Sequence, residues 1–288
     1  MKLSVLIPAY ERTCYKLVED LQTQLEESRA EYEIIVFEDG GRDQVSHIAN
    51  LKINDLTHCH YERRTRNVGR SAIRNRLADE AQGEWLLFID ADAKMVRRDF
   101  IRRYLAAAAE GHKLVCGGIT HRDTPPARDC LLRWCYDRTF ELQVGPVSPQ
   151  LSCFNFMVER ALFMKVRFNE SVTTYGWEDV LLGVGLKEQG AEMTTIDNPL
   201  LHDDADKSVR FMEKTRESLN TLHTHEHLLL QYTRLGNVVN TIRRWHMAAV
   251  VRGLFVAARP LMEHQLLGRH PDMRVFAAYK LGYYLSLR

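Results

Sequence analysis

The first third of the chain alternates short apolar runs with longer segments in which apolar residues recur at helical spacing. The apolar runs cover residues 3–8, 33–37 and 84–89, and the last is almost continuous, as is typical of a strand covered on both faces. Residues 15–25 and 69–81 show helical spacing instead. Strands separated by helices predict an α/β fold with a mostly parallel central sheet and flanking helices.

The remainder of the chain changes character near residue 207. Further strand and helix patterns continue the α/β arrangement up to that point, with strands at 113–119, 152–158 and 193–196 and helices from 159 and at 177–187. Beyond it, strand patterns vanish and helical patterns dominate. We therefore expect an α/β domain over residues 1–206, made of the segments 1–95 and 96–206, and a helical C-terminal region over residues 207–288.

Composition and charge limit the class of protein. Hydrophobic residues make up 45% and charged residues 27% of the 288 residues, which suits a globular protein, and a net charge of +1 favours no particular partner. No basic patch is interleaved with aromatic residues, so we expect no nucleic-acid partner. Six scattered cysteines without metal-type spacing indicate reduced thiols. Since the apolar start is too short for a secretory signal, we expect a cytoplasmic protein.

Polar residues follow three of the expected strands, at Pro8–Glu11, Glu38–Gly40 and Asp90–Asp92. The carboxyl ends of strands in an open α/β sheet share one edge, so these clusters predict one shared site. Asp90 and Asp92 project to the same side, and their repulsion favours a bound cation. Carboxylates suit Mg²⁺ or Mn²⁺, which usually completes its shell with substrate phosphates. The alternative is a solvated turn after a buried strand.

The sequence around these clusters resembles family 2 glycosyltransferases of the GT-A fold. Residues 66–92 read R-N-V-G-R-S-A-I-R-N-R-L-A-D-E-A-Q-G-E-W-L-L-F-I-D-A-D, similar to the family's Asn-x-Gly-x-x-x-Ala/Ile-Arg-Asn helix and its strand ending in Asp-x-Asp. The opening V-L-I-P-A-Y-E-R is also similar. At residues 38–41 the family usually has Asp-Asp-Gly-Ser, whereas Glu38 and Gly41 depart from it here. The blocks span roughly residues 3–95, which the resemblance makes the nucleotide-binding half, with the acceptor-binding half at 96–206.

The resemblance implies a nucleotide-sugar donor and assigns residues to it. Asp39 should accept a hydrogen bond from the base, as for uracil in similar enzymes, and Asp92 should bind the metal directly. Asp90 should bind ribose, or the metal through water. Arg74 is expected either to position this loop or the diphosphate, or to be a surface charge. The complete donor set is Pro8, Ala9, Tyr10, Glu11, Asp39, Asn67, Gly69, Arg74, Asp90 and Ala91.

A second acidic motif, Trp177-Glu178-Asp179, resembles the acceptor-side motif of inverting GT-A transferases. Stabilisation by the dipole of a helix that begins here is the alternative explanation for the two acids. The resemblance makes Asp179 the general base and Glu178 a ligand of acceptor hydroxyls, although the reverse assignment is open. Trp177 offers an aromatic face to a sugar ring. Asn155 is expected either to bind the acceptor or to belong to a core strand.

His202 lies about twenty residues past the second acidic motif, after the last expected strand. A lone histidine is usually an ordinary surface or core residue. Many family 2 glycosyltransferases have a histidine at this spacing that completes the coordination shell of the metal. The resemblance therefore makes His202 a third metal ligand beside Asp92 and Asp90.

The segment 243–262 in the C-terminal region has an amphipathic pattern. Its apolar side chains cluster on one helical face, with arginines roughly opposite, at Met247, Val250, Val251, Leu254, Ala258 and Leu261 against Arg244, Arg252 and Arg259. Two interpretations remain open: packing on the catalytic domain, or peripheral contact with anionic lipid at the cytoplasmic face of a membrane. Arg244-Trp245 is similar to a motif of processive synthases, but Thr241 stands where that motif has glutamine, which argues against such a synthase.

Together these features predict an inverting, metal-dependent glycosyltransferase. It would move one sugar from a nucleotide-sugar, with a uridine nucleotide favoured only by resemblance, to a hydroxyl on a glycan or lipid-linked glycan in polysaccharide biosynthesis. One alternative is a catalytically silent nucleotide-sugar or glycan-binding module. A sugar nucleotidyltransferase is less favoured, because such enzymes have a glycine-rich basic loop after the first strand and residues 9–12 read A-Y-E-R.

Overall fold

The computed structural model describes residues 1–141, 151–202 and 206–287, and these residues form two compact units. The sheet unit contains the described residues of 1–122, 151–173 and 178–202. The helical unit contains those of 123–141, 174–177 and 206–287. The sequence pattern places the C-terminal helices after residue 206 but gives no sign that 123–141 and 174–177 group with them.

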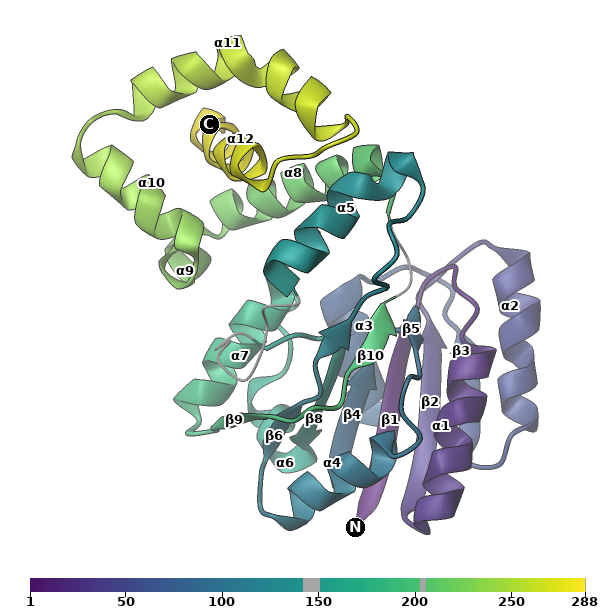
Figure 1. Cartoon of the computed structure of the whole chain (residues 1–288). Coiled ribbons are helices and arrows are strands. Elements are labelled where there is room, and N and C mark those ends of the chain that lie inside the picture. The colour runs from purple at the N-terminus through teal and green to yellow at the C-terminus, as the bar shows by residue number, and fades with distance from the viewer. Residues whose placement is uncertain (142–150, 203–205, 288) are drawn as a thin grey trace. The chain divides into compact units, whose positions relative to one another are not determined.

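A seven-stranded sheet in the order β3-β2-β1-β4-β8-β6-β9 forms the centre of the sheet unit (Figure 1). β1 is parallel to both β2 and β4, whereas β8 is antiparallel to both β4 and β6. The mostly parallel α/β fold predicted from sequence is confirmed, with one reversed strand. The strands are β1 (Lys2–Ala9), β2 (Glu31–Glu38), β3 (Cys59–Arg63), β4 (Trp85–Ile89), β6 (Leu114–Cys116), β8 (Asn155–Glu159) and β9 (Met193–Thr195).

Helices cover both faces of this sheet, so each face has its own apolar core. Leu3, Val5 and Ile7 of β1 belong to one core and Leu6 to the other, because successive side chains of a strand point to opposite faces. α1 (Tyr15–Ser28) and α4 (Phe100–Ala109) pack on the first core. The second core takes α3 (Arg70–Glu80), α6 (Arg160–Val166) and α7 (Glu178–Glu188), while α2 (Gln44–Leu51) follows β2.

A small sheet extends the carboxyl side of the central one. It has the order β5-β10-β7, formed by Ala93–Lys94, Leu200–His202 and Ile119–Thr120. β10 runs antiparallel to β5, with His202 opposite Ala93. This register places His202 beside the residue that follows Asp92. The sequence analysis expected the last strand at 193–196, so β10 is an additional strand.

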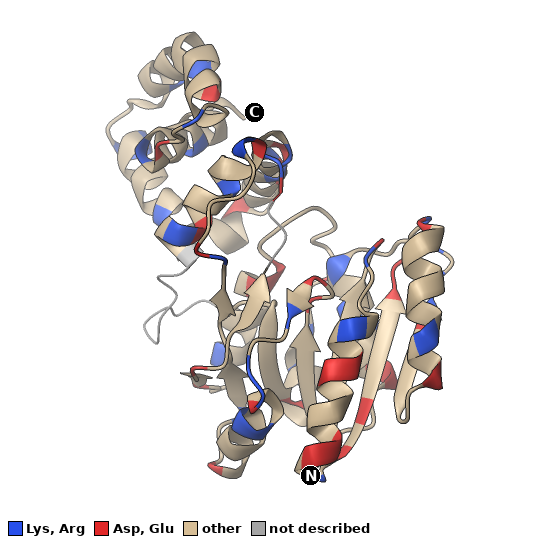
Figure 2. Cartoon of the chain, turned by 45° about the vertical axis from the view of Figure 1, so that its right-hand side comes forward, with Lys and Arg blue, Asp and Glu red and all other residues tan. Residues whose placement is uncertain are grey.

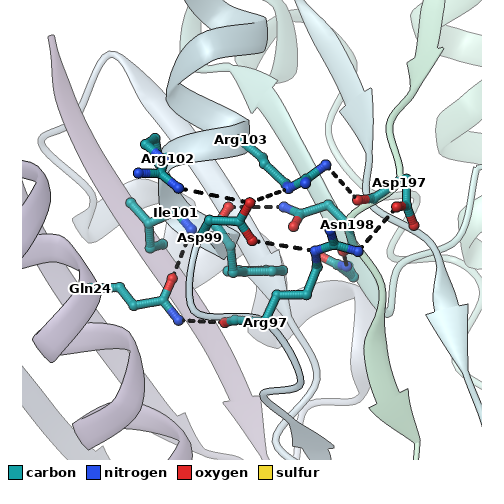
Figure 3. Close-up of polar contacts among 10 residues, drawn as sticks. Gln24, Arg97, Asp99, Ile101, Arg102, Arg103, Asp197 and Asn198 are labelled. Atoms are coloured by element: carbon teal, nitrogen blue, oxygen red, sulfur yellow. Dashed lines mark hydrogen bonds and ion pairs between the residues drawn. The ribbon is translucent and has the colours of Figure 1, made fainter.

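A polar network holds the connection that leads into β10 (Figure 3). Arg97 donates to Asp197 at 3.0 Å and Arg103 donates to Asp99 at 2.7 Å and to the Asp197 carbonyl at 3.2 Å. Asn198 is fully buried and donates to the Phe100 carbonyl at 2.9 Å. The backbone just before β10 is therefore fixed to the start of α4.

The helical unit has a core of its own. Its buried members are Leu132, Phe211, Met212, Phe255, Leu266, Phe276 and Tyr279. Its helices are α5 (Leu131–Tyr136), α8 (Ser208–Thr224), α9 (Glu226–Leu229), α10 (Arg234–Arg244), α11 (Ala248–Leu266) and α12 (Met273–Ser286). Short turns of other helix types occupy Lys52–Asp55, Arg128–Cys130, Asp137–Glu141 and Leu230–Tyr232. Within the described ranges, no helix is both long and apolar enough to cross a bilayer.

Candidate active site

The two acids after β4 lie where this buried strand ends and the chain turns into β5. The backbone N–H of Asp90 donates to Phe154, and the N–H of Ala93 donates back to the Asp90 carbonyl, at 3.1 Å in each case. This turn brings an oxygen of Asp92 to 3.5 Å from Nε2 of His202. The structure therefore unites two residues 110 positions apart that were both expected to bind metal.

Arg74 is the cation at the centre of the acidic groups. Its side chain is only 3% exposed, and it donates to Asp90 at 2.5 Å. The same guanidinium lies 3.8 Å from the carboxylate of Glu178. Of the two roles expected for Arg74, the structure excludes the surface charge. A buried arginine whose planar fork faces two carboxylates connects the first acidic motif to the second.

The second acidic motif begins α7. Glu178 is 6% exposed and also lies 3.8 Å from Arg70, whereas Asp179 is half-buried. Cys153 is buried, and burial raises the pKa of its thiol; Arg74 opposes this rise, and the charges of Asp179, Glu178 and Asp90 add to it. A single buried group senses acids from both motifs, so both belong to one electrostatic cluster.

Burial and charge shift the pKa values of these carboxyl groups in different directions. Desolvation and repulsion by Glu178 raise the pKa of Asp179 to about 7, although the Val180 N–H and Arg74 oppose the shift. Burial also raises the pKa of Asp90, despite Arg74. For Asp92, burial is outweighed by the hydrogen bond and charge of His202 and by Arg12, so the pKa of Asp92 is lowered. Acids with divergent pKa values are a signature of functional sites.

The loops after β1 and β2 are joined by side chains. Glu38 is 1% exposed and accepts the Glu11 N–H at 2.8 Å. Asp39 accepts the N–H groups of Val68 at 2.8 Å and Gly69 at 2.9 Å. Asp39 therefore fixes the loop before α3, and a hydrogen bond from it to a nucleotide base remains a proposal.

Two glycines shape this region. Gly40 has φ +69°, and a Cβ there would lie 2.3 Å from the Asn67 backbone nitrogen, so only glycine fits. Gly69, with φ +89°, precedes the first turn of α3. Of the residues in the expected donor set, Tyr10 is 53% exposed, Pro8 is half-buried, and Ala9 and Ala91 are buried.

Asn155 has a structural role, the second of the two alternatives for it. It is 1% exposed, and its amide donates to the carbonyls of Gly118 at 3.1 Å and Asn198 at 2.9 Å. Its oxygen accepts from the Tyr104 hydroxyl at 2.6 Å. All three bonds lie inside the fold, so Asn155 is not available to an acceptor, and that expectation is corrected.

Trp177 is anchored within the helical unit. Its ring N–H donates to the Ser218 carbonyl of α8 at 2.8 Å. Its φ of +74° is uncommon for a bulky residue and follows Gly176 at +95°. Stacking of this ring on a sugar remains a proposal.

Three residues of the site were missed by the sequence analysis. Arg70 and Arg12 act on the acids through their charges, and Glu38 was noted only as a departure from the family pattern. The position of Arg70 beside Gly69, at the first turn of α3, was the available signal for it. Nothing in the local sequence indicates that Arg12 approaches Asp92.

Comparison with known proteins identifies the family. The family described as "Glycosyl transferase family 2" matches residues 4–167, more than half of the chain. The chain belongs to glycosyltransferase family 2. As a family 2 glycosyltransferase it is an enzyme, which argues against the silent binding module and the nucleotidyltransferase.

Curated relatives of this family 2 glycosyltransferase share only part of its length. An uncharacterized glycosyltransferase of Haemophilus influenzae is 27% identical over 116 residues, which is 40% of this chain and 46% of that protein. Another, from Rickettsia felis, is 29% identical over 91 residues, which is 32% of this chain and 15% of that protein. The chain thus matches less than half the length of either relative.

Solved structures of low sequence identity share the fold. The crystal structure of S. aureus TarS with UDP has a TM-score of 0.54 at 16% identity and covers 99% of this chain and 89% of that one. The mannosyltransferase PcManGT from Pyrobaculum calidifontis, with GDP-Man and Mn²⁺, has a TM-score of 0.56 at 14% identity, covering 98% and 84%. The fold of this family 2 glycosyltransferase is therefore GT-A, as the resemblance implied.

Proposed function

We propose that this glycosyltransferase transfers a single sugar from a nucleotide-sugar to an acceptor hydroxyl, with inversion at the anomeric carbon. The supporting observation is the position of Arg74, which shares its guanidinium between Asp90 at 2.5 Å and Glu178 at 3.8 Å. A donor-side acid and an acceptor-side acid thereby meet at one cation. Direct displacement needs this arrangement, because the leaving diphosphate and the incoming hydroxyl must flank the same sugar.

Asp92 and His202 fit a divalent cation. Their facing atoms are 3.5 Å apart, close to the separation of about 3 Å between adjacent ligands at about 2.1 Å from an octahedral ion. A carboxylate together with an imidazole suits Mn²⁺, while Mg²⁺ prefers oxygen alone. Asp90 is held by Arg74, so we assign it to ribose or to a metal-bound water. A bound Mn²⁺ or Mg²⁺ would supply positive charge to the departing diphosphate.

The donor diphosphate would lie near the first turn of α3. Arg70 is 52% exposed at this turn, and its charge acts on both Asp90 and Glu178. Backbone N–H groups at the start of a helix favour phosphate, and Gly69 lets the chain approach it closely. Pro8, Tyr10, Glu11, Asp39 and Asn67 would border the base and ribose. UDP and GDP-Man in the solved neighbours are consistent with a nucleoside-diphosphate sugar.

Asp179 would act as the general base. A carboxylate oxygen of Asp179 takes the proton of the acceptor hydroxyl while the hydroxyl oxygen attacks the anomeric carbon. The bond between the anomeric carbon and the diphosphate breaks, and its electron pair leaves with the diphosphate. A pKa of about 7 for Asp179 suits this role, because a base is most effective when its pKa is near the working pH. Glu178 and the ring of Trp177 would hold the acceptor, a glycan or lipid-linked glycan.

Two measurements on matched variants test the proposal. In thermal shift with UDP-sugars and GDP-sugars, Mn²⁺ should increase the stabilisation, and Asp92→Asn or His202→Ala should abolish that increase. Asp179→Asn should keep the donor-dependent shift, yet release nucleoside diphosphate about 10²–10⁴ times more slowly with simple glycosides as acceptors. Asp20→Asn on α1, which lies in a surface ion pair with Lys16, is the control. Full release by Asp179→Asn would refute the assignment of the base.

A further inference from the structure

The helix α11 uses only one side of its surface to fold. Phe255 is 5% exposed and Leu266 is fully buried, and both belong to the core of the helical unit. The Phe255 ring lies 5.5 Å from that of Tyr279 on α12, and its atoms come so close to Gly282 that a Cβ there would lie 2.4 Å away. This side is therefore closely packed, and the helix is held in one orientation.

The opposite part of α11 exposes apolar side chains in a continuous stripe. Residues spaced three and four apart share one helical face, so these positions form a stripe about 100° wide. Leu254 is 68% exposed and Leu261 73%, with Val250 at 50% and Met247 at 45%. We call this set the outer stripe of α11: Met247, Val250, Leu254, Ala257, Ala258 and Leu261.

Five of the six residues of the outer stripe belong to the face expected either to pack on the catalytic domain or to touch lipid, and Ala257 replaces Val251. Within the helical unit, the residues of α11 that pack in the core are Phe255 and Leu266, and the outer stripe is not among them. Single exposed apolar residues are ordinary, but a contiguous set without a polar member indicates a surface that meets a partner. Trp245, 73% exposed just before the stripe, adds a side chain that favours the boundary between apolar and aqueous regions.

The charge of the same segment selects the kind of partner. Residues 233–288 contain nine Lys and Arg but two Asp and Glu, a net charge of +7. Since the whole chain has +1, residues 1–232 carry −6. Exposed arginines lie on either side of the stripe, with Arg244 before it and Arg269 after it. Figure 2 shows Lys and Arg in blue on the C-terminal helices.

We propose that the outer stripe of α11 docks in the plane of a bilayer that contains anionic phospholipid. Apolar side chains would enter the boundary between headgroups and acyl chains, while the surrounding arginines meet lipid phosphates. A second copy of the chain fits less well, because pairing through this stripe would bring two segments of +7 together.

Vesicle flotation of the full chain, without nucleotide-sugar, tests the proposal independently of catalysis. The chain should float with phosphatidylglycerol-containing vesicles, bind pure phosphatidylcholine at least about tenfold more weakly, and lose binding as salt rises. Leu254→Gln with Leu261→Gln should reduce binding to the anionic vesicles by about tenfold or more. The control is Val45→Gln with Ile48→Gln on α2, which changes two apolar residues of 76% and 61% exposure and should leave binding unchanged.

A second measurement uses the unaltered stripe. Brominated acyl chains should quench tryptophan fluorescence in the wild type, and Trp245→Phe should remove most of that quenching. Equal binding to neutral and anionic vesicles, or equal binding by the Leu254→Gln/Leu261→Gln variant and the wild type, would overturn the proposal. So would a dimer in light scattering that the same variant dissolves, because the stripe would then be a contact between copies.

Discussion

Replacement of Arg74 by methionine tests the central ion cluster. The side chain of Arg74 is 3% exposed, and the carboxylates it faces are 27% exposed for Asp90 and 8% for Glu178. Removing one partner of a buried ion pair costs about 3–5 kcal/mol, because the other charge stays buried without compensation. Asp90 keeps some contact with water, so we expect Arg74→Met to lower the free energy of unfolding by about 3 kcal/mol at pH 8.

The loss should depend on pH in a defined direction. Burial raises the pKa of Asp90 and Arg74 opposes that rise, so without the arginine the pKa of Asp90 rises further and protonation removes its uncompensated charge. The destabilisation should therefore be largest above neutral pH and shrink as the pH falls towards 5. Urea unfolding at both pH values, followed by circular dichroism, gives the two free energies.

Two further variants make the result decisive. Arg74→Lys keeps the charge but not the planar fork, and should recover part of the lost stability. Arg102→Met removes a helix arginine that is 80% exposed and 3.9 Å from Asp99, and should cost less than about 1 kcal/mol. If Arg74→Met unfolds within about 0.5 kcal/mol of the wild type at pH 8, Arg74 does not hold the acids together as described.

One change of pH and three further substitutions have defined outcomes. Transfer activity should rise with pH, with the midpoint of the rise near pH 7, because Asp179 has a pKa of about 7 and must lose its proton to act as a base. Glu178→Gln should move that midpoint to lower pH, because it removes a charge that repels Asp179. A pH–rate profile that is flat between pH 5 and 8 would contradict this. Gly282→Ala should destabilise the protein by about 1–3 kcal/mol because the new methyl overlaps the Phe255 ring. Gly253→Ala, which meets no atom within 4 Å, should be neutral or stabilising in thermal unfolding.

The sequence predicted the helices and strands whose buried residues form a recognisable local pattern of apolar positions. β1, β2, β4 and α3 lie within two residues of their expected bounds at both ends, because uninterrupted or periodic apolar residues identify them. α1 begins at Tyr15 as expected but continues to Ser28. Strand direction has no such pattern, so the reversal of β8 between β4 and β6 was not foreseen. β10 was also missed, since its three residues pair through backbone groups that carry no sequence signal.

For the candidate site, too, local motifs were predicted from the sequence and contacts between distant residues were not. Asp90, Asp92, Asp179 and His202 were selected by motif, and the structure places Asp92 beside His202. The contact of Arg74 with Glu178 joins residues 104 positions apart, and only the folded chain reveals it. Asn155 shows the opposite case: a polar residue on an expected strand looked available, but the Tyr104 hydroxyl and two carbonyls occupy its amide.

The chain passes between the two units at more than one point, and one of these points is the peptide bond between Trp177 and Glu178. Trp177 is fastened to the Ser218 carbonyl of the helical unit, and the next residue, Glu178, faces Arg74 in the sheet unit. Gly176 and Trp177, the two residues just before Glu178, have φ of +95° and +74°. A bulky residue has little torsional freedom in that region. The backbone that enters Glu178 is therefore stiff, and a substitution that relaxes Trp177 would shift the carboxylate that faces Arg74 through the covalent chain alone.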